Sequence, residues 1–234
     1  MRRRTIKSAL ILMIIAMVFT MMPLTASAAS KNPGKTKITS YKVGKVSSST
    51  SLTTVTIKWK KASKATGYEV WEKHGTNDWR KLKKVGRSKK GLKIKNAPTG
   101  LYSLKVRAIR KAKGKVYYGK FSAVKTKFIS SPMSLEQLAN KYPALKNSGD
   151  PAVLLTYSGN TAVYTMDILT LYPGLARYSK EYVLSIANGL LGSPEMINAA
   201  SQYRSEVNSN TGVTNARIRI VFNYKGVYLT SRDY

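Results

Sequence analysis

Apolar and polar residues alternate in short segments through the first half of the chain. In Thr53–Trp59 the side chains of Val55, Ile57 and Trp59 fall on one face of an extended segment. A period of two is typical of a strand that packs one face against a core. Glycines separate the segments, and about seven short strands in roughly 95 residues are typical of a β-sandwich. We therefore predict an all-β sandwich over residues 36–129.

The pattern changes after a short predicted linker at residues 130–133. Residues 134–142 begin with Ser-Leu-Glu-Gln, a capping box that predicts a short helix. Longer helices are predicted from Ser179 to Leu191 and from Ser193, where Ser-Pro-Glu is typical of a helix start. Residues 134–234 are thus predicted to form a small α+β domain with two to three helices. Its antiparallel hairpins are expected at residues 153–168 and 217–230.

The first 28 residues have the three parts of a secretory signal peptide. Arg2, Arg3 and Arg4 open it, and an apolar stretch of about 15 residues follows, shorter than the ~20 residues that span a bilayer. Small residues then lead to a predicted cleavage point between Ala28 and Ala29. We expect the mature protein to be secreted, extracellular or associated with the cell wall, without an integral membrane span.

The charge of the chain is strongly positive and unevenly distributed. The chain has 41 Lys and Arg against 10 Asp and Glu, a formal net charge of +31. Residues 31–128 hold 28 of the basic residues and three acids, a net charge of +25. Residues 133–234 hold nine basic residues and seven acids, a net charge of +2. A strong positive potential is therefore expected over one side, or the whole, of the sandwich.

Several motifs in the first half carry a resemblance to a known family. They are Val-Thr-Ile-Lys-Trp at 55–59, Ala-Thr-Gly-Tyr-Glu-Val at 65–70, Pro98–Ala108, and Tyr-Gly-Lys-Phe-Ser at 118–122. With these motifs, residues 36–129 resemble a bacterial fibronectin type III domain, an immunoglobulin-like sandwich. The resemblance implies that Tyr102 forms a corner hydrogen bond.

A looser resemblance covers the second half. Ser134-Leu-Glu136, Asn160–Thr165 (Asn-Thr-Ala-Val-Tyr-Thr) and the closing hairpin from Ile218 to Gly226 carry it. This part is similar to an uncharacterised family of small domains in secreted proteins and lipoproteins of Gram-positive bacteria. The resemblance implies a fold and a location, and no chemistry.

The sequence shows no recognisable catalytic or metal-binding pattern. The chain has no Cys and a single histidine, His74, which makes a zinc or other transition-metal site improbable. Glycoside hydrolysis normally needs two facing carboxylates, and the acids of the second half are scattered without a telling spacing. No phosphate-binding loop or nucleophile elbow is present. We expect a protein that is not an enzyme and that uses no cofactor.

The basic residues occur in runs and are the candidates for anion binding. A charge this large on a small domain destabilises its compact state, so a polyanionic environment is a better explanation than solubility alone. The predicted function is that of a non-catalytic binding or adhesion protein at the cell surface, held to teichoic acid or a similar polymer. The candidate residues are Lys58, Lys60, Lys61, Arg80, Lys81, Lys83, Lys84, Arg87, Lys89, Lys90, Arg110, Lys111, Lys113 and Lys115.

Aromatic residues leave a second interpretation open. Trp59, Tyr68, Tyr102 and Tyr203 are expected in the cores. A carbohydrate-binding or spacer protein is the alternative function, with a sugar stacked on residues closer to loops, namely Trp71, Trp79 and Tyr117. An enzyme with a site in the second half is a further alternative, and would need a cleft with converging polar groups. Nucleic acid is expected to bind only non-specifically, and an extracellular protein is a candidate partner of the second half.

Overall fold

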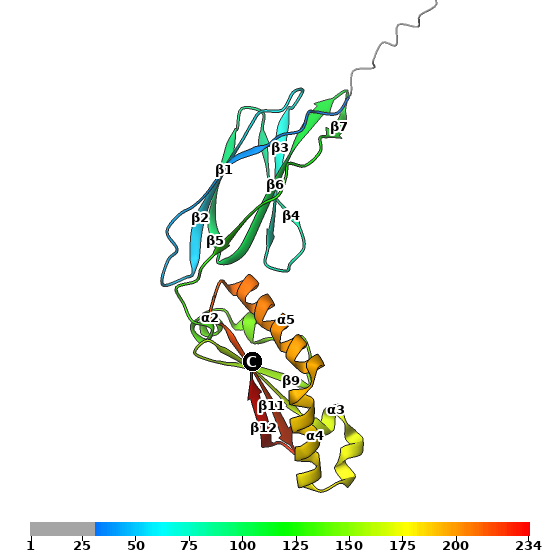
Figure 1. Cartoon of the computed structure of the whole chain (residues 1–234). Coiled ribbons are helices and arrows are strands. Elements are labelled where there is room, and N and C mark those ends of the chain that lie inside the picture. The colour runs from blue at the N-terminus through cyan, green and yellow to red at the C-terminus, as the bar shows by residue number, and fades with distance from the viewer. Residues whose placement is uncertain (1–30) are drawn as a thin grey trace, which may run out of the picture. The chain divides into compact units, whose positions relative to one another are not determined.

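The computed structural model describes residues 31–234 of the chain (Figure 1). The predicted signal peptide, with Ala28 and Ala29, lies outside the described residues. The first half is all-β, as the alternating pattern predicts. Its strands are β1 (Ile38–Val43), β2 (Leu52–Trp59), β3 (Gly67–His74), β4 (Arg80–Gly86), β5 (Gly91–Pro98), β6 (Gly100–Ala112), β7 (Lys115–Tyr118) and β8 (Lys125–Ile129).

These strands form two antiparallel sheets. One sheet has the order β1-β2-β5, and the other has the order β4-β3-β6-β7. Strand β8 also pairs with β6, at Gly100–Leu104, whereas β7 pairs with β6 at Ile109–Ala112. The strands β7 and β8 therefore follow one another along the same side of β6.

The alternation in the sequence matches the burial in the sandwich. Val55 and Ile57 of β2 are fully buried, as are Val70 of β3 and Leu104 of β6, so both sheets contribute to one core. Trp59, Tyr68 and Tyr102 are also buried, as predicted. The Trp59 and Tyr68 rings lie against each other with centroids 5.6 Å apart.

Two core tyrosines, Tyr68 and Tyr102, make hydrogen bonds inside the sandwich. The bond of Tyr102 differs from the corner hydrogen bond that the resemblance implies. The Tyr68 hydroxyl accepts the Ala62 backbone N–H at 3.0 Å, which ties the loop after β2 to the core. The Tyr102 hydroxyl instead donates to the buried carboxylate of Glu72. Burial, followed by this hydrogen bond, raises the pKa of Tyr102 well above its ordinary value. Arg80 Nη2 lies 2.6 Å from the other Glu72 oxygen.

The second half mixes helices and strands, as predicted, but has one more α-helix than expected. The single-turn helix α3 was not predicted, because four residues are too few to show a helical period. The elements are α2 (Leu135–Lys141), β9 (Val153–Ser158), β10 (Thr161–Asp167), α3 (Ile168–Leu171), α4 (Lys180–Gly192), α5 (Pro194–Thr211), β11 (Arg217–Tyr224) and β12 (Val227–Asp233), with 3₁₀ turns at Pro143–Lys146 and Pro173–Arg177.

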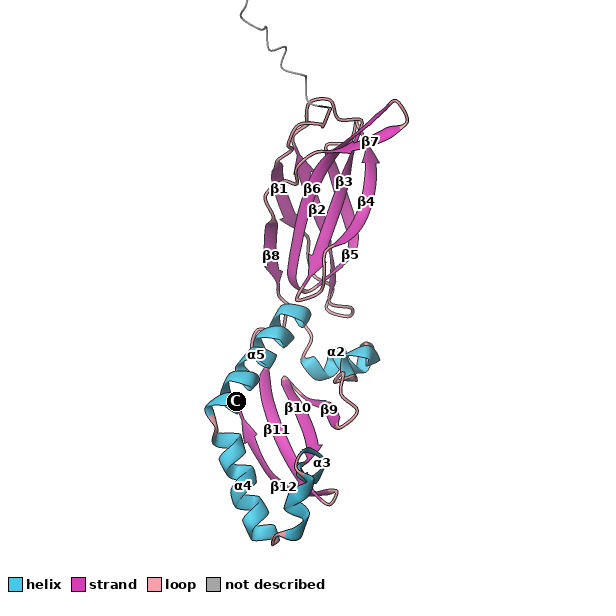
Figure 2. Ribbon diagram, turned by 90° about the vertical axis from the view of Figure 1, so that its right-hand side faces the viewer, coloured by secondary structure: helices cyan, strands magenta, loops and turns pink. Residues whose placement is uncertain are grey.

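Both predicted hairpins are present, but a parallel pairing joins them. The sheet has the order β12-β11-β10-β9, and β10 runs parallel to β11. Parallel neighbours need a long crossover, and α3, α4 and α5 provide it (Figure 2). Ile218, Ile220 and Phe222 of β11 are buried in the same apolar cluster as residues of α2, α4 and α5. One face of this sheet is thus covered by helices.

The helix ends follow the capping signals in the sequence. The Ser134 hydroxyl accepts the Gln137 N–H and the Gln137 side chain accepts the Ser134 N–H, which completes the predicted capping box. Ser193 caps α5, with Pro194 as the first helical residue. At the other end of α5, Gly212 adopts φ +80°, a left-handed conformation that glycine adopts without strain.

Each half has its own apolar cluster, one within residues 38–129 and one within residues 135–222. Residues 32–234 nevertheless form one compact unit. Hydrogen bonds link the halves: the Thr99 hydroxyl donates to the Thr211 carbonyl at 2.6 Å, and the Tyr142 hydroxyl donates to the Thr50 carbonyl at 2.7 Å. The division into two domains at residues 130–133 stays a prediction.

Gly67 offers a test of the packing in the sandwich. A Cβ at this position would lie 2.7 Å from the Val85 carbonyl oxygen and 3.4 Å from the Ile109 side chain. Gly67→Ala is therefore expected to lower the free energy of unfolding by about 1–3 kcal/mol, measured by urea denaturation. Gly86 is the cross-strand partner of Gly67, and a Cβ there meets no described atom within 4 Å. Gly86→Ala is the matched control, and an equal loss in both variants would contradict the packing argument.

Candidate anion-binding surface

The strand registers bring three separate basic segments to one end of the sandwich. Gly67, at the start of β3, pairs with Gly86 at the end of β4 and with Ile109 near the end of β6. The N–H of Trp59, at the end of β2, donates to the Lys90 carbonyl at 2.8 Å. The connections β2–β3, β4–β5 and β6–β7 therefore all lie at this end.

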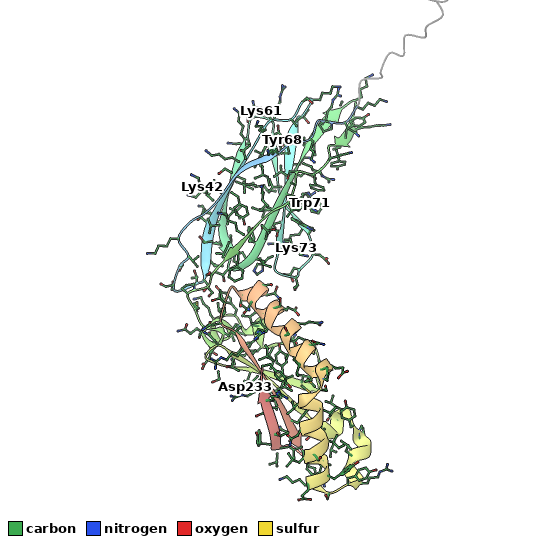
Figure 3. All side chains as sticks on the ribbon, viewed as in Figure 1. Lys42, Lys61, Tyr68, Trp71, Lys73 and Asp233 are labelled. Carbon is green, nitrogen blue, oxygen red and sulfur yellow. The ribbon has the colours of Figure 1, made fainter. Side chains whose placement is uncertain are left out.

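We call this surface the basic end and define it by residues 60–66, 87–90 and 110–115. These three segments contain ten Lys and Arg and no Asp or Glu. All ten are exposed except Arg110, which is half-buried. Lys61 lies at this end in Figure 3, whereas Lys42 lies along the side of the sandwich. The ten residues are Lys60, Lys61, Lys64, Arg87, Lys89, Lys90, Arg110, Lys111, Lys113 and Lys115.

A second basic stretch lies on β4 and β5, the edge strands of their two sheets. Its exposed side chains are those of Arg80, Lys81, Lys83, Lys84, Lys93 and Lys95. Arg80 is paired with Glu72, and Lys81 Nζ lies 3.9 Å from Glu69. Lysines on edge strands also prevent pairing with strands of other molecules, so this stretch has a structural explanation that the loops lack.

Nine of the fourteen predicted anion-binding residues belong to the basic end, and four belong to β4. The remaining one, Lys58, lies on β2 opposite Gly91, beside the β4–β5 connection. The structure therefore brings together runs that are up to about 50 residues apart in the sequence. Lys64 was not among the predicted residues, because its sequence neighbours Ser63 and Ala65 are uncharged and it belongs to no run of basic residues.

The outer face of the β4-β3-β6-β7 sheet carries a cluster of cations and aromatic rings, whose basic members Lys105 and Arg107 were not among the predicted site residues. Lys105 Nζ lies 4.0 Å from the ring centroid of Trp79, 4.5 Å from that of Phe121 and 5.9 Å from that of Trp71. Such contacts stabilise a cation by electrostatic attraction to the ring faces. Burial, and then the nearby Arg107, lower the pKa of Lys105.

Arg107 continues this cluster towards β7. Its guanidinium carbon lies 4.1 Å from the Tyr118 ring centroid and 4.9 Å from that of Phe121. Its Nε and Nη2 donate to one oxygen of Glu69 at 2.8 and 2.7 Å. Glu69 is only 3% exposed, so its charge is almost hidden from solvent.

Two of the three aromatic residues predicted to stack on sugar lie in this cluster. Trp71 and Trp79 both contact Lys105, so their rings already face a cation of the chain. Tyr117 does not join them. It pairs with Arg110, whereas Tyr118 pairs with Ile109, and successive residues of a strand point to opposite faces.

Among residues 31–234, no group of three or more His, Cys, Asp or Glu side chains could hold a metal ion. His74 lies at the end of β3 and its Nε2 is 2.6 Å from the Thr99 carbonyl oxygen. The same part of the chain contains no helix long and apolar enough to cross a membrane.

Comparisons with known proteins found matches among solved structures. No family model matches the chain, and no curated protein matches it. Solved structures similar to it include a redesigned β-sandwich protein, with 19% identity, a TM-score of 0.31 and coverage of 41% of this chain and 95% of that chain. Another is a fibronectin type III domain of human collagen XX, with 18% identity, a TM-score of 0.29 and coverage of 42% of this chain and 94% of that chain. The prediction of a bacterial origin, and of a family for the second half, stays a prediction.

The ion pair of Glu69 gives a test of the outer-face cluster. Glu69→Gln leaves the Arg107 guanidinium, whose side chain is 22% exposed, without its charged partner. We expect a loss of about 2–4 kcal/mol in the free energy of unfolding, measured by urea denaturation. Lys81→Gln is the control, because its side chain is 54% exposed and 3.9 Å from the carboxylate, and it should change stability by about 1 kcal/mol or less. Similar losses of stability in the two variants would contradict the view that the Glu69–Arg107 ion pair contributes more to folding than the exposed contact of Lys81.

Proposed function

We propose that the chain is an exported, non-catalytic binding protein that attaches to anionic polymers of the cell envelope, such as teichoic acid. The basic end of the sandwich is the binding surface. The observation that carries the proposal is the convergence of three connections with ten basic residues and no acid at one end of the fold.

The concentration of charge argues for a ligand. Like charges that lie close together repel one another and destabilise the compact state. Charges that only served solubility would be better placed far apart over the surface, as in typical small domains with a net charge of about 2–8. A polyanion that spans the basic end would neutralise several of these cations at once.

The acids of the sandwich do not offset this charge. Of its three acids, Glu69 and Glu72 are each only 3% exposed and are paired within the fold. The third, Asp78, lies in the β3–β4 connection, at the opposite end from the basic end. Of the described residues, those that define the basic end include no acid, and the carboxylates of the sandwich are either buried or in the β3–β4 connection.

A carbohydrate-binding protein is the second candidate function. Trp71 and Trp79 lie with Lys105 on the outer sheet face, a combination of rings and positive charge that would suit an acidic sugar. Their contacts with Lys105 are the reason to rank this function second, because a sugar would compete with a cation of the chain for the ring faces. In either case the second half would be displayed at the cell surface or would bind a protein partner.

Binding to cell walls across a salt series tests the proposed function. Each Lys or Arg near an anionic surface contributes roughly 1 kcal/mol, and the binding constant for a polyanion falls steeply with salt as counterions are released. We expect the purified protein to co-sediment with isolated walls in dilute buffer and to be released by high salt. Walls stripped of teichoic acid should bind much less protein. Binding that persists in high salt would favour stacking on neutral sugar and reject the electrostatic proposal.

Variants in which lysines are replaced by uncharged residues test where on the sandwich the polymer binds. Lys61, Lys89, Lys90 and Lys111 of the basic end are changed together to Gln, and wall binding is measured by co-sedimentation. At roughly 1 kcal/mol per cation, the affinity should fall by at least about tenfold. The control variant makes the same charge change elsewhere on the sandwich, at the exposed Lys42, Lys45, Lys125 and Lys127. Equal losses in both variants would show that net charge, and not the basic end, determines binding.

A further inference from the structure

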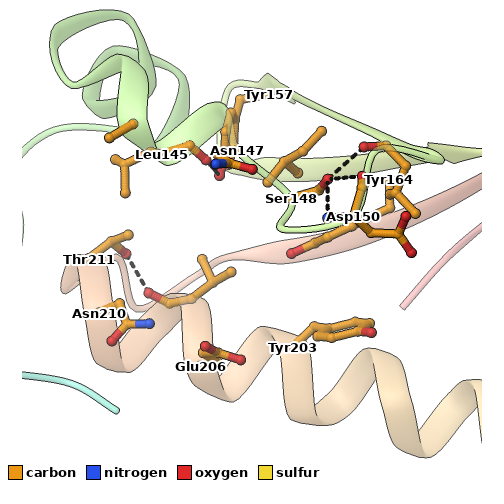
Figure 4. A pocket seen from close by; sticks show the side chains of 14 residues that line it. Leu145, Asn147, Ser148, Asp150, Tyr157, Tyr164, Tyr203, Glu206, Asn210 and Thr211 are labelled. Atoms are coloured by element: carbon orange, nitrogen blue, oxygen red, sulfur yellow. Dashed lines mark hydrogen bonds between the residues drawn. The ribbon is translucent and has the colours of Figure 1, made fainter. Parts of the chain in front are cut away.

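The second half contains a pocket whose charged lining residues are acidic, in contrast to the basic surface of the sandwich. Its volume is about 320 Å³, and it lies between the segment after α2, the inner face of β9 and β10, and helix α5 (Figure 4). Pockets for small ligands start at about 300 Å³, so this one would hold a compact molecule.

The charged residues of the pocket are both acidic. Asp150 comes from the loop before β9, and Glu206 comes from α5. Among the described residues that line the pocket there is no Lys, Arg or His. This is the reverse of the whole chain, which has 41 Lys and Arg against 10 Asp and Glu. An anion would be repelled here, and a cation would be attracted.

Three tyrosines line the pocket, together with the uncharged polar residues Asn147, Ser148, Asn210 and Thr211. The Tyr164 and Tyr203 rings are stacked, with centroids 5.3 Å apart and planes 16° apart. The Tyr157 hydroxyl donates to the Leu145 carbonyl at 2.7 Å, which ties the segment after α2 to the sheet. Burial, followed by the neighbouring Tyr157, Tyr203 and Glu206, raises the pKa of Tyr164 to about 12. Tyr164 therefore stays uncharged at neutral pH.

The hydrogen bonds of the two acids leave capacity for a ligand. One Asp150 oxygen accepts the Ala152 N–H at 2.9 Å, which shapes the loop. One Glu206 oxygen is 3.4 Å from the Thr76 hydroxyl, a long contact. A carboxylate can accept about four hydrogen bonds, so both acids can accept more.

We propose that this pocket binds a small organic ammonium ion, held by the carboxylates of Asp150 and Glu206 beside the Tyr164–Tyr203 pair. Aromatic rings and carboxylates together recognise ammonium groups in proteins. A divalent metal ion is not the favoured ligand, because among the described residues no group of three or more His, Cys, Asp or Glu side chains could hold one. The proposal concerns the second half alone and does not rest on polymer binding by the sandwich.

A ligand titration followed by NMR tests the proposal. Choline chloride is added to the ¹⁵N-labelled full chain at constant chloride concentration, and amide shifts are followed at residues 147–150 and 206–211. The matched control ligand is 3,3-dimethyl-1-butanol, in which an uncharged carbon replaces the nitrogen of choline. Ethanolamine is a further probe that separates a primary from a quaternary ammonium ion.

We expect at least one of the two ammonium probes to cause saturable shifts in these segments and to bind about tenfold or more tightly than the uncharged control. Glu206→Gln and Asp150→Asn should each weaken binding by about 3- to 10-fold. Glu195→Gln removes a charge from the same helix outside the pocket and should leave binding unchanged. The dispersion of the amide spectrum shows whether each variant is folded. If one of the two acid variants does not fold, the other variant tests the proposal.

Three results would overturn the proposal: no saturable shift with either ammonium probe, equal affinity for the uncharged control, or unchanged affinity in folded variants of both acids. The four-lysine variant of the basic end should bind the ammonium probe as the parent does. A loss of wall binding with ammonium binding intact, or the reverse, therefore separates the two proposals.

Discussion

The position of β3 between β4 and β6 is the constraint on which the arrangement of the sandwich depends. Gly67 begins this strand, and the absence of a side chain allows the Val85 carbonyl to approach closely. The register that starts there fixes which connections lie at which end of the fold. The basic end is therefore a consequence of strand pairing, although its residues are spread over three distant parts of the sequence.

The same strand also determines how the sandwich uses its acids. Glu69 points to the outer face, where Arg107 and a group of rings cover it, whereas Glu72 lies in the core beside Tyr102. The two acids thus hold the fold together and are hardly visible to solvent. Each acid pairs with an arginine of the sandwich, Glu69 with Arg107 and Glu72 with Arg80, and neither acid belongs to the three connections of the basic end.

Local patterns predicted the elements well, and tertiary arrangement decided the rest. The alternation in Thr53–Trp59, the capping box at Ser134 and the turn residues of both hairpins are local signals, and each corresponds to an element of the structure. Tyr203 shows the limit of such signals. It follows the apolar stripe of α5 and was predicted to be in the core, but it is 44% exposed and stacks on Tyr164. The prediction was wrong because helical spacing shows which residues share a face of the helix, but not how much of that face other elements cover.

Sites that depend on distant residues were the least predictable. Asp150 and Glu206 have no telling spacing in the sequence, and only the packing of α5 across β10 brings them to one pocket. The contact of Trp79 with Lys105 depends in the same way on the pairing of β3 with β6. Charge composition, by contrast, does not depend on the fold, so the basic character of the first half could be predicted in full.

The parallel pairing of β10 with β11 has a consequence for how the second half folds. Each hairpin can form from residues close together in the chain, but the centre of the sheet joins segments that are separated by the whole helical crossover. Closing so long a loop is slow compared with forming a hairpin. The central pairing is therefore expected to be slower to form than either hairpin. Until it forms, each hairpin exposes an unpaired edge to which other chains could add.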